Sequence, residues 1–304
     1  MQRAWARVGW IVYVFLCAGL ALAEESQTAA ADPAEAGIGT PVPSRLPPGK
    51  QWKLVWSDEF DGTELDRGKW GFRLHMMHQR HETWVEDAWY LDGQGHLVLT
   101  VYERDGDYFT SQLQTGANFM DRPPDSSFTQ KFVWPIAELE PPRFLHKYGY
   151  YEIRCKLPTQ PGWWVAFWLQ SPCIGATLDP GESGVEIDIM ENFSRDGVIS
   201  HAVHTGGYGK NRQSKGSGPI RLGESPDGFH TFGLLWTPRE YVFYADGRET
   251  WRIDGPISHR EQFILVSAEC MGYRREGRPS PELQAAQIPD EFVVDYVRVF
   301  DEVP

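Results

Sequence analysis

Residues 184–192 read Gly-Val-Glu-Ile-Asp-Ile-Met-Glu-Asn, an apolar run that carries three acids, Glu186, Asp188 and Glu191. A β-strand turns successive side chains to opposite faces, so Glu186 and Asp188 share one face and Glu191 falls on the other. One extra residue, inserted as a β-bulge around Ile189 and Met190, would return Glu191 to the face of the other two acids. The stretch therefore predicts a bulged strand that lines one surface with three carboxylates.

Acids that alternate along a strand have two interpretations. In most strands they form a solvated face. In a glycosidase, two carboxyl groups face each other across one glycosidic bond, about 5 to 5.5 Å apart in retaining enzymes and about 6.5 to 9.5 Å apart in inverting ones. The rest of the chain decides between these interpretations.

Further blocks of the chain resemble glycoside hydrolase family 16, and they run in the family's order over residues 51–301. The acidic stretch resembles the six-residue, bulged motif of the family's β-1,3-glucanases and marine galactanases. The other blocks are residues 53–62, 147–158, 164–169, 228–238, 244–247 and 294–300.

The resemblance implies an all-β fold, a two-sheet antiparallel β-jelly-roll sandwich of the concanavalin A-like type. It implies a retaining endo-hydrolase of O-glycosidic bonds in a β-linked polysaccharide, either a β-1,3-glucan or a marine galactan. Glu186 is then the nucleophile, Glu191 the general acid and base, and Asp188 the residue that orients Glu186. No cofactor enters the chemistry, but a structural Ca²⁺ occurs in many members, and Asp295 and Gly95 match positions that bind it there.

Two other functions compete with hydrolysis. A non-catalytic glycan-binding protein on the same sandwich would have lost the catalytic carboxylates, whereas this chain retains all three. A transglycosylase shares every residue named above and differs in how well its cleft excludes water. The sequence leaves hydrolysis and transglycosylation open.

Alternation along three other strands predicts residues of the substrate cleft. Over residues 163–170, Val165, Phe167 and Leu169 form an apolar face, which leaves the tryptophans on the other face. His204 follows Val203 in the chain and therefore lies on the other face of the same strand. It resembles the family histidine near the acid/base, although a surface histidine is the other interpretation. A Glu and an Arg within residues 149–157 lie opposite the apolar set and match family cleft positions. The predicted substrate-binding residues are Trp164, Trp168, His204, Arg154 and Glu152.

Strand signals recur at short intervals with Gly, Pro, Asn and Asp between them, which is typical of a β-sandwich in one domain. Only residues 281–286 have a helical pattern. The predicted strands are residues 96–103, 149–157, 163–170, 185–192, 200–205, 229–236, 241–244, 262–270 and 292–300.

The first fifty residues differ in composition from residues 51–304. Residues 1–23 combine two arginines, an apolar run and a final Ala-Leu-Ala, which is the pattern of a secretory signal peptide. Residues 24–50 are rich in Ala and Pro and predict a disordered linker, so the sandwich covers residues 51–304. We expect a secreted or periplasmic monomer without a stable membrane span after cleavage.

The net charge of the 304-residue chain is −13. Residues 1–23 contribute +2 and residues 24–50 contribute −2, so the domain carries the whole −13, which excludes a typical nucleic-acid partner. The expected partner is therefore a polysaccharide. Two basic loops, residues 210–215 and 274–278, are either solvated or a wall of the cleft. Three cysteines remain after cleavage, Cys155, Cys173 and Cys270, and their pairing stays open.

Overall fold

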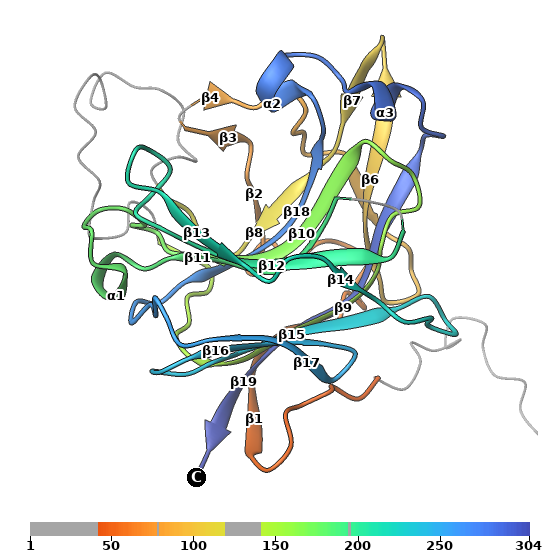
Figure 1. The fold of residues 1–304 in the computed structure, drawn as a ribbon. Helices are drawn as coiled ribbons and strands as arrows, with labels where there is room; N and C mark the ends of the chain where they lie inside the picture. The colour runs from red at the N-terminus through yellow and green to blue at the C-terminus, as the bar shows by residue number, and fades with distance from the viewer. Residues whose placement is uncertain (1–41, 78, 119–140, 194–195) are drawn as a thin grey trace, which may run out of the picture. The chain divides into compact units, whose positions relative to one another are not determined.

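Two antiparallel β-sheets stack on each other in the computed structural model, which describes residues 42–77, 79–118, 141–193 and 196–304 (Figure 1). The described residues belong to one compact unit, and the predicted signal peptide, residues 1–23, lies outside them. The predicted all-β, two-sheet sandwich is confirmed. The helices among the described residues are single turns, α1 (Pro180–Ser183), α2 (Tyr273–Glu276) and α3 (Pro281–Gln284).

The first sheet contains nine strands among the described residues. Its main order is β17-β16-β15-β9-β19-β6-β5, with β1 paired to β19 and β7 paired to β6. The strands are β1 (Gln51–Asp58), β5 (Trp89–Leu91), β6 (Leu97–Arg104), β7 (Asp107–Phe109), β9 (Gly149–Lys156), β15 (His230–Trp236), β16 (Tyr241–Ala245), β17 (Arg248–Ile253) and β19 (Asp290–Val303).

The second sheet contains eight strands in the described part of the chain, and the site lies on it. Its main order is β13-β12-β11-β10-β18-β8-β2, with β14 paired to β12. The strands are β2 (Gly71–Phe72), β8 (Gln112–Gln114), β10 (Trp163–Gln170), β11 (Glu186–Asn192), β12 (Val198–Thr205), β13 (Gln213–Gly216), β14 (Ile220–Arg221) and β18 (Phe263–Cys270). A separate hairpin consists of β3 (His75–Met76) and β4 (Gln79–Arg80).

The core lies between the two sheets because each strand turns alternate apolar side chains inward. Val165, Phe167 and Leu169 of β10 are fully buried in it, as predicted, and Val203 and Cys155 are buried there as well. All three cysteines of the domain are buried free thiols. The inward face of β10 therefore fixes its other face, with Trp164 and Trp168, toward the outside of the sandwich.

A second, smaller apolar cluster lies on the outer face of the nine-stranded sheet. Leu46 and Trp52 pack on this cluster of Tyr150, Leu235, Val242, Tyr244 and Phe300. Arg298 also donates hydrogen bonds to the Val42 carbonyl oxygen (2.7 Å) and to Ser44 Oγ (2.8 Å). Residues 42–50 are thus held against the domain, which corrects the predicted linker over that part, and residues 24–41 lie outside the described residues.

Most of the predicted strands are present with bounds shifted by one or two residues, and β10 has the predicted bounds. The predicted helix over 281–286 is the shorter α3. The sequence did not predict β1, whose eight residues show no regular alternation of buried and exposed positions. It also missed short strands such as β5, β7 and β13, because three or four residues carry too little periodicity. No helix in the described residues is long and apolar enough to cross a membrane.

Candidate active site

The predicted bulge lies in β11, between its two partner strands. Along β10, Phe167 pairs with Met190 and Trp168 pairs with Asp188, so Ile189 has no counterpart. The register with β12 shifts over the same residues. The carbonyl oxygen of Ile189 accepts a hydrogen bond from His201 Nδ1 at 2.6 Å, so the backbone group displaced from the ladder is satisfied.

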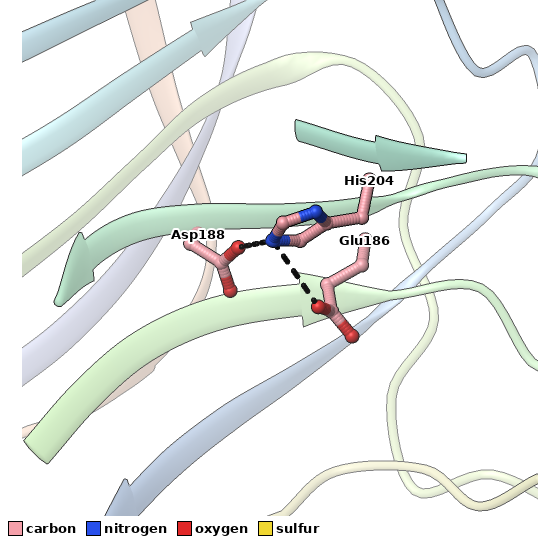
Figure 2. A group of neighbouring side chains, drawn as sticks. All are labelled: Glu186, Asp188 and His204. Carbon is pink, nitrogen blue, oxygen red and sulfur yellow. Dashed lines mark ion pairs between the residues drawn. The ribbon is translucent and has the colours of Figure 1, made fainter. Parts of the chain in front are cut away.

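The bulge brings the three acids to one surface, where a histidine joins them. His204 Nε2 lies 3.1 Å from Asp188 Oδ2 and 3.7 Å from Glu186 Oε1 (Figure 2). His204 Nδ1 lies 2.6 Å from Ser214 Oγ of β13, which orients the ring. His204 lies on the outer face that alternation predicts for it, and it is opposite Glu186 in the β11–β12 register.

Burial favours the neutral forms of Glu191 and Asp188. Burial, followed by the charges of Asp188 and Glu186, raises the pKa of Glu191 to about 9. Burial, followed by the charge of Glu186, also raises the pKa of Asp188 well above its ordinary value. Burial lowers the pKa of His204, so the imidazole is the neutral form near pH 7. The site therefore holds a protonated carboxyl at Glu191.

Glu186 has hydrogen-bond partners outside the acidic motif. The Tyr208 hydroxyl, from the loop between β12 and β13, donates to Glu186 Oε2, and Gln170 Nε2 of β10 lies 3.5 Å from the same oxygen. Gln170 Nε2 also donates to the Tyr208 hydroxyl. Tyr208 and Gln170 thus form a polar support beneath one oxygen of this carboxylate.

The acids line a cleft of about 640 Å³ on the outer face of the eight-stranded sheet. Its walls come from the β3–β4 hairpin, from the loop after β12 and from α2; the hairpin and α2 stand on the same side of this sheet (Figure 1). Trp164 and Trp168 line it, as predicted. Trp164 stacks on Phe193 with ring centroids 5.0 Å apart, and Trp168 Nε1 donates to Ser267 Oγ at 2.9 Å.

Known proteins resemble this chain in sequence and in fold. The family model for glycosyl hydrolases family 16 matches residues 138–261. A glucan endo-1,3-beta-glucosidase of Cryptopygus antarcticus is 31% identical over 221 residues, which cover 69% of each chain. The chain belongs to glycosyl hydrolase family 16. The resemblance inferred from the sequence motifs is therefore confirmed.

Two other family 16 comparisons extend this likeness. A glucan endo-1,3-beta-glucosidase A1 of Niallia circulans is 27% identical over 292 residues, and this chain spans 40% of the length of that relative. The catalytic domain of an endo-1,3-beta-glucanase (laminarinase) from Thermotoga petrophila RKU-1 has the same fold, with a TM-score of 0.62 and 24% identity. That likeness covers 84% of this chain and 100% of the laminarinase chain.

Two predicted substrate-binding residues of this family 16 chain are not in the cleft. Glu152 and Arg154 lie on β9, in the nine-stranded sheet, whereas the acids lie on the eight-stranded sheet. Glu152 is fully buried and accepts hydrogen bonds from the Tyr296 hydroxyl (2.7 Å) and the Arg45 backbone N–H (2.9 Å). The prediction was wrong because alternation gives the face of a strand and not the sheet to which the strand belongs.

The surroundings of the predicted calcium ligands, Asp295 and Gly95, also differ from those of a calcium site. Arg154 forms ion pairs with Asp295 and Asp227, so a guanidinium already neutralises the Asp295 carboxylate. Ca²⁺ takes six to eight oxygen ligands, and a cationic neighbour disfavours it. The arrangement at Asp295 therefore does not fit the predicted site with Gly95.

One group in the described residues could hold a metal ion, and it is the acidic cluster itself. Ligand atoms of Glu186, Asp188 and His204 lie within 4.8 Å of one another. The Arg212 guanidinium lies 3.3 Å from the His204 ring, and its positive charge disfavours a second cation there. The group is better described as an acidic cluster beside a neutral imidazole.

Several cleft residues were not predicted from the sequence. Tyr208 follows two glycines in a loop, where no periodicity indicates the direction of a side chain. The basic loops divide between the two interpretations: Arg212, Arg274 and Arg275 line the cleft, whereas Lys215 Nζ donates to the Gly255 carbonyl oxygen.

Proposed function

We propose that the chain is a retaining endo-hydrolase of a β-1,3-linked glucan. The observation that carries this proposal is the bulge in β11, which brings Glu191 to the surface of Glu186 within an open cleft. A cleft that is open along a sheet admits the middle of a polymer chain, which favours internal cleavage. The two relatives described above are named glucan endo-1,3-beta-glucosidases, which favours a glucan as the polymer.

The two glutamates divide the chemistry between them. Glu191 donates its proton to the glycosidic oxygen while a Glu186 oxygen attacks the anomeric carbon, so the C–O bond to the leaving sugar breaks and a glycosyl ester forms. The raised pKa of Glu191 supplies the protonated carboxyl that the first step needs. Water then attacks the anomeric carbon and gives a proton to Glu191. The bond to Glu186 breaks and releases its carboxylate, so both groups return to their starting forms.

Asp188 and His204 support the acid pair. The Asp188 carboxyl lies between the two glutamates in the strand and within 3.1 Å of His204 Nε2. Burial raises the pKa of Asp188, and a protonated Asp188 carboxyl adds no negative charge next to Glu186. Asp188 therefore limits the repulsion among the three acids.

The aromatic rings supply the contacts with the sugar chain. Trp164 and Trp168 project from β10, the strand next to the acids, and partly buried indole rings present flat apolar faces to sugars. The Arg73 guanidinium lies over the Trp168 ring, 5.3 Å from its centroid. This platform would align the polymer across the strands.

Substrate digestion tests the function directly. The protein is incubated with laminarin, mixed-linkage glucan, agarose, porphyran and carrageenan, and the products are sized. We expect short oligosaccharides from laminarin, with loss of cleavage in Glu186→Ser and in Glu191→Gln although both variants stay folded. Laminarin bound but uncleaved would indicate the glycan-binding alternative, and longer products would indicate transglycosylation.

Export is a separate proposal, which rests on the composition of residues 1–23. N-terminal sequencing of protein recovered outside the cytoplasm would test it. We expect a new N-terminus directly after Ala23. Recovery of the uncut chain in the cytoplasm would contradict export.

A further inference from the structure

The direction of the hydrogen bond between Tyr208 and Glu186 follows from its neighbours. A phenol has one proton to donate, and it can also accept. Because Gln170 Nε2 donates to the Tyr208 hydroxyl, the phenol proton is free for Glu186 Oε2. Tyr208 is therefore the donor and the Glu186 carboxylate is the acceptor.

The amide of Gln170 is itself held in one orientation. Its Oε1 accepts hydrogen bonds from Arg73 (3.1 Å) and Asn118 (2.7 Å), and both partners can only donate with these nitrogens. The Nε2 group must then face Tyr208 and Glu186. A chain of hydrogen bonds thus ends at Glu186 Oε2. It consists of four buried or partly buried side chains, Arg73, Asn118, Gln170 and Tyr208.

The other oxygen of Glu186 is held less tightly. Oε1 lies 3.7 Å from His204 Nε2, which is beyond hydrogen-bond distance. We propose that Tyr208 is a positioning residue that anchors Oε2 of Glu186, so that Oε1 is the atom that attacks the anomeric carbon. This inference rests on the proposed function, and it adds the oxygen and the residue that select it.

The kinetic test is Tyr208→Phe, which keeps the ring and removes the hydroxyl. A hydrogen bond to a charged group contributes more than one between neutral groups, so kcat should fall roughly 10- to 100-fold with little change in KM. The acidic limb of the kcat/KM profile should move to higher pH, because the ionised nucleophile loses a donor. A profile that keeps its acidic limb, with only KM or stability changed, would overturn the inference.

Tyr296→Phe is the matched control. Tyr296 is also buried and donates to a buried carboxylate, Glu152 Oε1, at 2.7 Å, but on the nine-stranded sheet. Its loss should lower stability without moving the acidic limb. An equal movement in both variants would show that the effect is structural.

Crystal structures of the wild type and of Tyr208→Phe separate this inference from the proposed function. We expect one orientation of the Glu186 carboxyl group in the wild type and a rotated or divided one in the variant. An unchanged carboxyl group would refute anchoring even in an active enzyme. A rotated carboxyl group in a protein that cleaves none of the five polysaccharides would support anchoring and reject the function.

Discussion

Glu191→Gln should abolish cleavage and at the same time stabilise the fold. In the folded protein, burial and the neighbouring acids raise the pKa of Glu191 from 4.5 to about 9. In the unfolded chain the carboxyl returns to its ordinary pKa and ionises at neutral pH. Because the folded state then binds the extra proton, Glu191 makes the fold less stable as the pH rises from about 4.5 to about 9.

The size of the effect follows from that shift. Within this window, each pH unit lowers the free energy of unfolding by about 1.4 kcal/mol. At pH 7 the carboxyl group of Glu191 therefore lowers the free energy of unfolding by about 3 kcal/mol. A glutamine has nearly the same shape and does not titrate. Glu191→Gln should therefore add about 3 kcal/mol to the free energy of unfolding at pH 7, and about 1 kcal/mol at pH 5.

Urea unfolding at pH 5, 7 and 8, followed by tryptophan fluorescence, measures this difference. Glu224→Gln is the control, because Glu224 is exposed and its replacement should change stability by less than about 0.5 kcal/mol. A gain that is absent, or that shrinks as the pH rises, would mean that Glu191 is ionised in the fold. The assignment of Glu191 as general acid would then fail.

Three further predictions concern the aromatic platform, the stereochemistry and a buried histidine. Trp168→Ala should lower the affinity for laminarin oligosaccharides more than it lowers stability, as calorimetry and thermal unfolding would show; the reverse would place the ring in the core. Proton NMR of a fresh digest should show the β-anomer first, whereas early α-anomer would indicate inversion. Burial lowers the pKa of His201 to about 4, so stability should fall by about 3 kcal/mol as pH falls from 6.5 to 4. His201→Gln should remove most of that loss in urea unfolding.

The sequence was sufficient for the features that depend on local alternation. The apolar positions of 184–192 fixed the inner face of β11, so three acids on the other face required a bulge, and the register confirms it. The same argument placed Trp164 and Trp168 on the outer face of β10. These predictions succeeded because the side-chain period of a strand is two and a buried face tolerates no slip.

The sequence could not predict features that depend on which strands pair with each other. Glu152 and Arg154 lie on the polar face of their strand, as Trp164 lies on the outer face of β10. Their strand β9, however, pairs with β15 and β19 in the other sheet. Tyr208 reaches Glu186 from a loop whose path depends on tertiary contacts. Local periodicity carries no information about either pairing or loop path.

The segment over the outer face of the nine-stranded sheet sets a limit on maturation. If a protease removed residues 42–47, Arg298 would lose its contacts with Val42 and Ser44, and the buried Glu152 carboxylate would lose the Arg45 backbone donor. The apolar cluster around Tyr150 would also lose Leu46. A cut at residue 51, where the family resemblance begins, would therefore weaken the fold, whereas a cut after Ala23 would leave all of these contacts in place.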